Sequence, residues 1–234
     1  LHTATLLHDD VVDASELRRG KPTANKIWGE QASVLVGDYL YSRAFQLIVK
    51  VNHSGILEIL AEASNIMAEG EVQQLLNCHN PDLTEAAYMQ VIYQKTGTLF
   101  AAAAQSGAVL AGCKISQIAA LKQYGTYLGT AFQLVDDALD YAATSEQIGK
   151  QMGKDLSEGK PTLPVLRALQ QLEAPFSLSL RQAIQQGQAE DLAGLIKLIE
   201  STDAISYTYQ LAKQQAELAR TCLSEVPASG YRDG

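Results

Sequence analysis

The stretch GTAFQLVDDALDY, residues 129–141, joins an apolar segment to three aspartates, Asp136, Asp137 and Asp140. Apolar residues that recur every three or four positions, as they do before these aspartates, are typical of a helix that faces a protein core. On such a helix Asp136 and Asp140 are one turn apart, and their carboxylates face the same way. The stretch therefore predicts a core helix that ends in a patch of negative charge.

The same helical spacing recurs along the chain, and no segment alternates between apolar and polar residues over the length of a strand. Thr84 is expected to cap a helix, and Gly112 to end it. We expect an all-α fold, a bundle of long helices. The expected helices cover about residues 1–14, 24–51, 55–78, 84–112, 116–143, 162–171, 177–187, 191–200 and 203–225.

The 234 residues are 47% hydrophobic and 19% charged, which is enough to bury a sizeable core. The net charge of −8 argues against a nucleic-acid partner, because proteins that bind phosphate backbones carry clustered Lys and Arg. Three cysteines without CxxC spacing predict neither a disulfide framework nor a zinc site, so a reducing, cytoplasmic location is expected. No run reaches the roughly 18 apolar residues of a transmembrane segment.

A second acidic cluster, LLHDDVVD at residues 6–13, repeats the spacing of the first with Asp9, Asp10 and Asp13. Like charges one helical turn apart repel by roughly 0.2–0.5 kcal/mol per pair, and partial burial increases the cost. Mg²⁺ offsets such repulsion, since it binds one or two carboxylates and takes its other ligands from water and substrate phosphate. The alternative, a solvated helix end, fits one cluster taken alone better than two clusters that both follow apolar segments.

Basic and amide side chains accompany both clusters. Arg18, Arg19 and Lys21 follow the first across a short turn, and Lys150, Lys154 and Lys160 follow the second. Arg binds phosphate through paired hydrogen bonds and Lys as a point charge, so both suit a diphosphate. Lys95 lies in KTG within an apolar helix and needs a partner, whereas a loop lysine such as Lys154 is more simply solvated. Gln133 fits either a ligand contact or a core amide that a neighbouring helix satisfies.

Four segments in this order, LLHDDVVDASELRRGKPTAN, KTG, FQLVDDALDY and GKDLSEGKPTLP, resemble the trans-polyprenyl diphosphate synthases. The segments HTATLLHDDVVD and SVLVGDYLYSRAF are most similar to the bacterial long-chain branch, the octaprenyl diphosphate synthases. The resemblance runs from residue 1 to about residue 172 and weakens beyond it. Paired DDxxD motifs combined with RRG and KTG are highly specific for this family.

The resemblance implies an isoprenoid synthase-type fold, a bundle of helices around a central cavity in which the two aspartate-rich motifs face each other. It implies three Mg²⁺ ions, bound by Asp9 and Asp13 from the first motif and by Asp136 with Asp140 from the second. Catalytic roles are implied for Asp9, Asp13, Lys95 and Asp136. Contacts to the allylic diphosphate are implied for Arg18, Lys95, Thr96, Gln133, Lys150 and Lys160, and contacts to isopentenyl diphosphate for His2 and Arg19.

The implied reaction is the head-to-tail condensation of isopentenyl diphosphate with an allylic diphosphate. The allylic C–O bond ionises, the double bond of isopentenyl diphosphate attacks the cation, and the released diphosphate takes up the proton that is lost. Mg²⁺ and basic side chains stabilise the departing diphosphate, and apolar walls exclude water. The expected product is octaprenyl diphosphate, for the side chain of ubiquinone.

Chain length is expected to depend on the helix turn before the first motif. Ala4 and Thr5 are small, whereas family members with short products tend to carry a bulky aromatic residue there. Small side chains leave a product tunnel open beyond that level. Ile66 or Met67, on the expected third helix, would form its floor, although simple core packing explains both residues equally well.

The resemblance also predicts one polyprenyl synthase domain over residues 1–234 that lacks the N-terminal helices of the family. The family's upstream glycine-lysine-arginine motif has no counterpart, so we expect part of the isopentenyl diphosphate site to be missing, and the activity of these residues alone stays open. Alanine-rich segments such as LFAAAAQSGAVLAG fit a homodimer, and core packing equally well. Release of an apolar product predicts transient contact with a membrane.

Three alternatives to a long-chain synthase stay open. A medium-chain or geranylgeranyl diphosphate synthase would differ only in product length. A terpene cyclase shares an aspartate-rich metal site, but it needs neither a repeated DDxxD nor RRG. A non-catalytic subunit of a heteromeric synthase usually lacks aspartates in one motif, whereas both motifs are complete here.

Overall fold

The computed structural model of the protein describes residues 1–142, 152–189 and 191–233. Contacts divide these residues into two compact units. Unit 1 holds residues 1–64, and unit 2 holds the described residues from Asn65 onward. The all-α prediction is confirmed, because the strands in the described residues are only two residues long. The expectation of one domain over residues 1–234 stays a prediction.

Unit 1 consists of helices and one short hairpin. Its elements are α1 (His2–Val12), β1 (Leu17–Arg18), β2 (Lys21–Pro22), α2 (Ala24–Trp28), α3 (Glu30–Lys50) and the start of α4 (Ser54–Asn77). The strands pair antiparallel around a two-residue turn in which Arg19 (φ 52°) and Gly20 (φ 73°) both have positive φ. Such a turn matches the twist of the paired strands, and it fixes the segment that follows the first acidic cluster.

Helices α1 and α3 pack closely within unit 1. The Ser33 hydroxyl on α3 donates to the Leu7 carbonyl on α1 (2.9 Å). His8 Nε2 lies 3.2 Å from a carboxylate oxygen of Asp38. A Cβ atom at Gly37 would lie 2.3 Å from Nε2 of His8, so the imidazole ring packs directly over this glycine and would have to move for a larger residue. This packing fixes the helix that carries the first cluster.

The helix predicted over 24–51 is broken at one residue. Gly29, at φ 88°, separates α2 from α3. This backbone conformation is accessible to glycine and costly for other residues, so the chain turns there although the apolar spacing continues on both sides. The break is a correction to the sequence-based helix boundaries.

Unit 2 contains the end of α4 and the remaining helices. These are α5 (Glu85–Ile92), the π-helical segment η1 (Tyr93–Gly97), α6 (Thr98–Leu110), α7 (Ile115–Ala142), α9 (Lys154–Ser157), α10 (Leu163–Gln171), α11 (Phe176–Gln186), α12 (Leu192–Glu200), α13 (Ala204–Cys222), the 3₁₀ turn η2 (Leu223–Glu225) and α14 (Gly230–Asp233). The predicted cap at Thr84 is confirmed, since its hydroxyl accepts a hydrogen bond from the Ala87 amide (3.2 Å). Gly112, at φ 65°, follows α6 as predicted.

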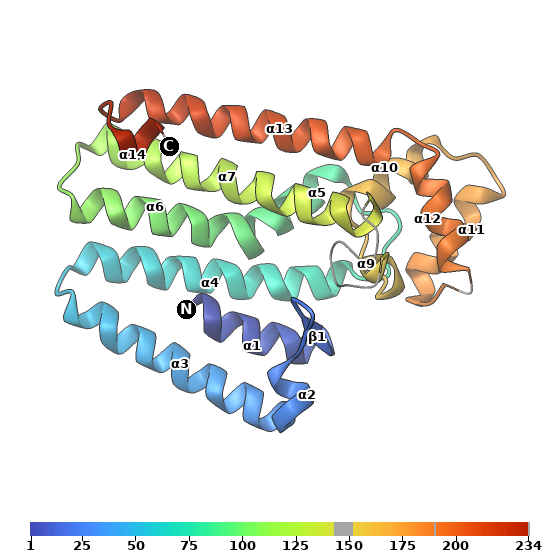
Figure 1. Cartoon of the computed structure of the whole chain (residues 1–234), viewed down its shortest axis with the longest axis horizontal. Helices are drawn as coiled ribbons and strands as arrows, with labels where there is room; N and C mark the ends of the chain where they lie inside the picture. Colours follow the sequence, from blue (N-terminus) through green and yellow to red (C-terminus); the bar gives the residue numbers. More distant parts are fainter. Residues whose placement is uncertain (143–151, 190, 234) are drawn as a thin grey trace. The chain divides into compact units, whose positions relative to one another are not determined.

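Helices α6, α7 and α13 lie side by side in unit 2 (Figure 1). Glycines let α6 and α7 approach closely. A Cβ atom at Gly125 would lie 2.4 Å from the Phe100 carbonyl oxygen, and one at Gly129 would lie 2.8 Å from the Gly97 Cα. Because both obstacles are backbone atoms, the first can move aside only with α6 and the second only with η1. The contact holds the KTG segment against the helix that carries the second acidic cluster.

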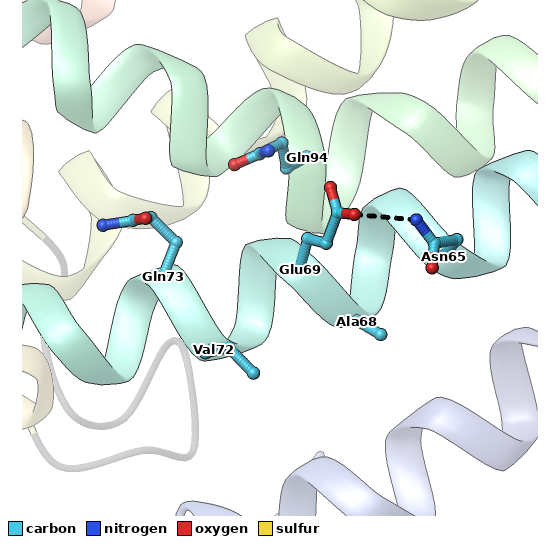
Figure 2. A pocket seen from close by; sticks show the side chains of 6 residues that line it. All are labelled: Asn65, Ala68, Glu69, Val72, Gln73 and Gln94. Atoms are coloured by element: carbon cyan, nitrogen blue, oxygen red, sulfur yellow. Dashed lines mark hydrogen bonds between the residues drawn. The ribbon is translucent and has the colours of Figure 1, made fainter.

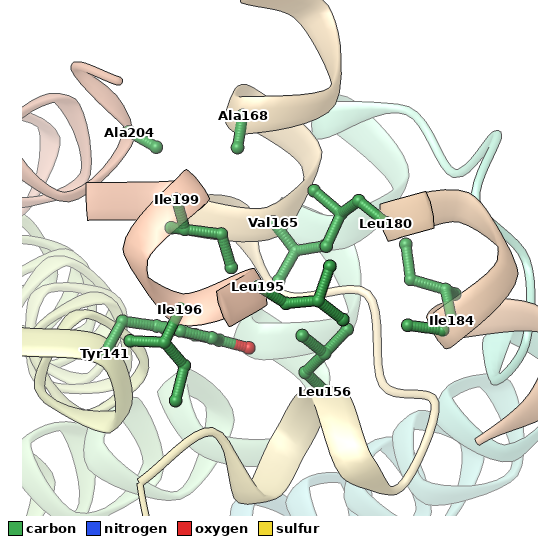
Figure 3. Close-up of a cluster of buried hydrophobic side chains, with 11 residues drawn as sticks. Tyr141, Leu156, Val165, Ala168, Leu180, Ile184, Leu195, Ile196, Ile199 and Ala204 are labelled. Atoms are coloured by element: carbon green, nitrogen blue, oxygen red, sulfur yellow. The ribbon is translucent and has the colours of Figure 1, made fainter. Parts of the chain in front are cut away.

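Two apolar cores hold the end of α7 in place. Figure 3 shows the first core, in which the fully buried Tyr141 of α7 packs with Leu156 of α9 and with side chains from α10 to α13. The second core contains Tyr88, Ile92, Leu134, Leu163, Leu166 and Ala212. Burying a large apolar side chain contributes up to roughly 1.5–3 kcal/mol. Because both cores include residues of α7 close to its acidic end, packing fixes the helical backbone that carries the aspartates.

None of the helices in the described ranges is both long enough and apolar enough to cross a lipid bilayer.

Candidate active site

The first acidic cluster lies on the last turns of α1. Asp9 and Asp13 are half-buried, whereas Asp10 between them is buried. The Asp13 amide donates to the Asp9 carbonyl (2.8 Å), so the helical turn is intact between these two residues. Their carboxylates therefore leave the helix on the same side, as the sequence predicts.

Asp10 binds the hairpin that follows α1. Arg18 donates from Nε and Nη2 to Oδ1 of Asp10, at 3.1 Å and 2.9 Å. The side chain of Asp10 is 5% exposed and that of Arg18 is 41% exposed. Asn25 adds a hydrogen bond from its side-chain amide to the Asp10 carbonyl (3.1 Å). Two donors of Arg18, which the resemblance assigns to a diphosphate, are thus engaged by a structural carboxylate.

The adjacent arginines predict a matched pair of variants. We expect Arg18→Ala to lower the free energy of unfolding by about 2 kcal/mol, because it leaves the buried Asp10 carboxylate without its charged donor. Arg19 is exposed in the turn, so Arg19→Ala should change stability by less than about 0.5 kcal/mol. Urea denaturation of both variants measures the difference. Equal stabilities would contradict the structural role of Arg18.

The second acidic cluster, at the end of α7, resembles the first in that its middle aspartate is buried and its outer two are more exposed. Asp136 is exposed, Asp140 is half-buried and the middle residue, Asp137, is buried. Asp137 accepts hydrogen bonds from the Tyr88 hydroxyl (2.5 Å) and from Gln133 Nε2 (2.7 Å). The Asp140 carboxylate accepts from the backbone amides of Lys154 (3.3 Å) and Asp155 (3.1 Å).

Negative charge is concentrated around this cluster. Burial raises the pKa of Asp137 to about 6; the hydrogen bonds from Tyr88 and Gln133 act against that rise, and the nearby Asp136 and Asp140 carboxylates add to it. Burial also raises the pKa of Asp155 well above its usual value, and Asp140 and Asp137 raise it further. Carboxylates that raise one another's pKa bind protons, or cations, more tightly.

These residues fit Mg²⁺. The donors are carboxylate oxygens, which this hard cation prefers. A divalent ion bound between these carboxylates would neutralise their negative charges and so remove the repulsion between them. Within the described ranges no group of three or more His, Cys, Asp or Glu side chains is placed to hold a metal ion by itself. A Mg²⁺ ion needs only one or two carboxylates when water and phosphate complete its shell, so the outer aspartates of each cluster are sufficient.

Lys95 has the partner that its apolar surroundings require. Its Nζ lies 3.0 Å from an oxygen of Glu71 and donates to the side-chain amide oxygen of Gln74 (2.7 Å), both on α4. A Cβ atom at Gly70 would lie 2.7 Å from the Cβ of Gln94, so glycine brings α4 against η1. The prediction that Lys95 needs a partner is confirmed, and the partner lies in unit 2.

Thr96 is hydrogen-bonded to α7. Its hydroxyl donates to the amide oxygen of Gln133 (2.9 Å), which itself donates to Asp137. Gln133 is therefore satisfied both by its own helix and by η1. Thr96 lies in the π-helical segment, where the wider turn is bridged by a hydrogen bond from the Thr98 hydroxyl to the Tyr93 carbonyl (3.0 Å). Such π turns occur frequently at functional sites.

Two of the three lysines that follow the second cluster, Lys154 and Lys160, lie in the described residues. Nζ of Lys160 lies 2.8 Å from one oxygen of Glu158, and Nζ of Lys154 lies 3.2 Å from the other. The side chain of Lys160 is only 13% exposed, so it is held more firmly than a solvated loop lysine. Lys150, the remaining expected contact in this segment, lies outside the described residues.

The residues assigned to chain length and to the second substrate are distributed over both units. In unit 1, His2 is exposed, Ala4 is 1% exposed and the Thr5 hydroxyl donates to the His2 carbonyl (2.8 Å). In unit 2, Ile66 and Met67 are half-buried on α4. Their roles in product length stay predictions.

Unit 2 contains a hollow of about 510 Å³ beside these residues of α4 (Figure 2). It is lined by Asn65, Ala68, Glu69, Val72, Gln73 and Gln94. Asn65 donates to Glu69 across one turn of the helix (2.8 Å), as the dashed line in Figure 2 shows. Asn65 and Ala68, which line the hollow, flank Ile66 and Met67 in the sequence. The hollow therefore lies along the helix to which the sequence analysis assigns the tunnel floor.

Sequence reasoning missed three residues of this site. Glu71, Tyr88 and Asp155 bind or face the predicted site residues. Glu71 and Tyr88 belong to no motif used to find the site, and Asp155 lies in GKDLSEGKPTLP but was assigned no role. Glu71 offered little signal, because α4 also carries Glu58, Glu62 and Glu69, and the sequence does not show which of these carboxylates lies against Lys95. A tyrosine on an apolar helix face reads as core, so nothing indicated the hydrogen bond of Tyr88.

Comparison with protein families gives a match to the polyprenyl synthetase model over residues 1–199. The chain belongs to the polyprenyl synthetase family. It is 49% identical to the octaprenyl diphosphate synthase of Escherichia coli (strain K12) over 234 residues, which cover all of this chain and 72% of that protein. It is 43% identical to the all-trans-nonaprenyl-diphosphate synthase (geranyl-diphosphate specific) of Rhodobacter capsulatus, with 99% of this chain and 71% of that protein covered.

Solved structures of the family show the same fold. The polyprenyl synthase from Caulobacter crescentus CB15, crystallised with calcium and isoprenyl diphosphate, matches with a TM-score of 0.95 and 48% identity over 99% of this chain and 71% of that chain. The all-α isoprenoid synthase-type fold expected from the sequence is therefore confirmed.

Proposed function

We propose that the protein is a long-chain trans-prenyltransferase that condenses isopentenyl diphosphate with an allylic diphosphate, to octaprenyl length. Membership of the polyprenyl synthetase family gives the reaction class. Octaprenyl length is supported by the 49% identity to the Escherichia coli octaprenyl diphosphate synthase, and the 43% identity to the nonaprenyl-diphosphate synthase of Rhodobacter capsulatus makes nonaprenyl length an alternative. The observation that carries the proposal is that both clusters bury their middle aspartate, whereas the outer two carboxylates of each cluster stay at least partly exposed one helical turn apart.

The outer aspartates are proposed as the metal ligands, Asp9 with Asp13 and Asp136 with Asp140. Mg²⁺, the usual ion of this family, is proposed in three copies, and when bound it would neutralise the charge of the departing diphosphate.

The basic and polar side chains of the chain bind and orient the substrates. Lys95, Lys160 and Arg18 supply fixed positive charge for the allylic diphosphate, and Thr96 with Gln133 supplies hydrogen bonds. The same role is proposed for Lys150. His2 and Arg19 are proposed contacts to isopentenyl diphosphate. Because these groups are positioned before the C–O bond breaks, they lower the barrier without reorganising during the reaction.

A product assay tests this proposal. The protein is incubated with labelled isopentenyl diphosphate, farnesyl diphosphate and Mg²⁺, and the extended chains are sized by chromatography. We expect Mg²⁺-dependent elongation that ends mainly at octaprenyl length. Products that stop at geranylgeranyl length would favour the shorter-chain alternative, and absence of elongation at every Mg²⁺ concentration would contradict the proposed activity.

Product length is proposed to depend on the turn of α1 before the first cluster. We expect Ala4→Phe or Thr5→Phe to shorten the products, because an aromatic ring there would block the tunnel. Thr5 is half-buried and is the more tolerant position, so its variant separates a blocked tunnel from a folding defect at the buried Ala4. Thermal unfolding verifies both variants. An unchanged length distribution from a folded Thr5→Phe protein would place the tunnel elsewhere.

The wider assignments follow from this function. A homodimer, a cytoplasmic location, transient membrane contact during release of the product, and supply of the ubiquinone side chain are proposed with it. Sedimentation of the purified protein measures the oligomeric state directly.

A further inference from the structure

A line of four hydrogen-bonded side chains crosses unit 2 from a buried tyrosine to the KTG segment. The Tyr88 hydroxyl donates to Oδ2 of Asp137 (2.5 Å), and Gln133 Nε2 donates to Oδ1 of Asp137 (2.7 Å). The Thr96 hydroxyl donates to Oε1 of Gln133 (2.9 Å). These residues come from α5, α7 and η1, so the line joins three elements through side chains alone.

The first member of the line is held rigidly. Tyr88 is 4% exposed, and its ring belongs to the second apolar core with Ile92 and Leu134. Close-packed side chains in a core occupy one rotamer, so the Tyr88 hydroxyl has a defined position. The Asp137 carboxylate is consequently fixed in both position and rotation.

The direction of each hydrogen bond follows from the chemistry of the line. An ionised carboxylate only accepts hydrogen bonds, so the Gln133 amide must turn its nitrogen toward Asp137 and its oxygen toward Thr96. Thr96 then donates its only hydroxyl proton to Gln133. The second N–H of the Gln133 amide is not used within this line, and it suits an acceptor such as a diphosphate oxygen.

We propose that Tyr88 is a positioning residue for Thr96 and Gln133, and that it acts on them through Asp137. The inference rests on the proposed function, which makes Thr96 and Gln133 contacts of the allylic diphosphate. Tyr88 itself is not a contact, because its hydroxyl is buried against Asp137.

The test is Tyr88→Phe, which keeps the ring in the core and removes one hydroxyl group. Calorimetric titration with a non-ionising allylic thiodiphosphate in the presence of Mg²⁺ should give about tenfold weaker binding, because Asp137 loses the hydrogen bond that fixes it and Gln133 and Thr96 are then less precisely positioned for the diphosphate. The matched control is Tyr207→Phe, whose hydroxyl donates to a carboxylate oxygen of Glu85 (3.0 Å) in the same unit. Its affinity should stay within about twofold of the wild type.

A double-mutant cycle tests the path of the effect. If Tyr88 acts through the line, Tyr88→Phe should weaken binding by less than about twofold when Gln133→Leu is already present, because that substitution removes the link from Asp137 to both contacts. Independent, multiplicative effects of the two substitutions would overturn the proposal. Equal losses of affinity in Tyr88→Phe and Tyr207→Phe would overturn it too, since they would indicate a general effect on the fold.

Hydrogen exchange separates this inference from the proposed function. In ligand-free protein the amides of Tyr93–Gly97 should exchange faster in Tyr88→Phe than in Tyr207→Phe, because the loss of the Tyr88 hydroxyl loosens Asp137 and, through it, the Gln133 amide that holds Thr96 of η1. A wild-type protein that fails to bind the allylic analogue would contradict the proposed function, and exchange would still decide the positioning role. Unchanged exchange at these amides would overturn that role.

Discussion

Asp136→Ala and Asp9→Ala are each expected to lower kcat/KM for chain elongation by about a thousandfold while leaving the fold intact. Each substitution removes one carboxylate from the proposed Mg²⁺ sites, and loss of a single group that stabilises developing charge typically reduces the rate by about 10²–10³. Asp136 is exposed and Asp9 is half-buried, so neither side chain is part of an apolar core. Steady-state elongation assays over a range of Mg²⁺ concentrations measure the effect.

The control for these variants is Glu200→Gln, which removes an exposed carboxylate from α12. Its kcat/KM should equal that of the wild type within about twofold. Thermal unfolding of all three variants should agree within a few degrees. Mg²⁺-dependent elongation that persists at wild-type rates in Asp136→Ala would remove this residue from the metal site.

Gly125→Ala is expected to destabilise unit 2 by about 3 kcal/mol or more. The added Cβ would lie 2.4 Å from the Phe100 carbonyl oxygen and 2.6 Å from the Ala101 Cα, which are backbone atoms of α6. To accept a methyl group α6 must move away from α7, and overpacking of this kind typically costs about 1–3 kcal/mol even where side chains can adjust. Urea denaturation followed by circular dichroism measures the loss.

Gly107→Ala supplies the matched control on the opposing helix. Nothing lies within 4 Å of a Cβ atom at Gly107, and the residue is inside α6. Alanine is the better helix former, so this variant should be more stable than the wild type by about 0.5–1 kcal/mol. If both variants shift stability in the same direction, helix propensity rather than the α6–α7 contact governs these positions.

The helices of this fold could be predicted from the sequence because their apolar spacing is long and regular. The segments predicted at 162–171 and 191–200 correspond to α10 (Leu163–Gln171) and α12 (Leu192–Glu200). The break at Gly29 could not be predicted, since a single glycine inside a periodic segment is compatible with an uninterrupted helix. Only its φ of 88° in the folded chain reveals the turn.

The candidate site could be predicted as a set of residue types, but not as a division of roles. Asp9, Asp10 and Asp13 carry the same functional group, and spacing alone does not show that Asp10 is buried against Arg18. Adjacent arginines differ for the same reason, because the hairpin turn sends Arg18 toward α1 and leaves Arg19 exposed. Such roles depend on contacts between residues that are separated along the chain.

The π turn at Tyr93–Gly97 makes the count of residues between α5 and α6 as important as their identity. Every residue added to a helix rotates all that follows by about 100° around the axis. Gly97 meets Gly129 because the wide turn accommodates an additional residue. A deletion of one residue there would leave the helical content nearly constant, but it would rotate α6 about its axis relative to α7. The number of residues in η1 therefore matters for the fold as much as the identity of Lys95 matters for the proposed site.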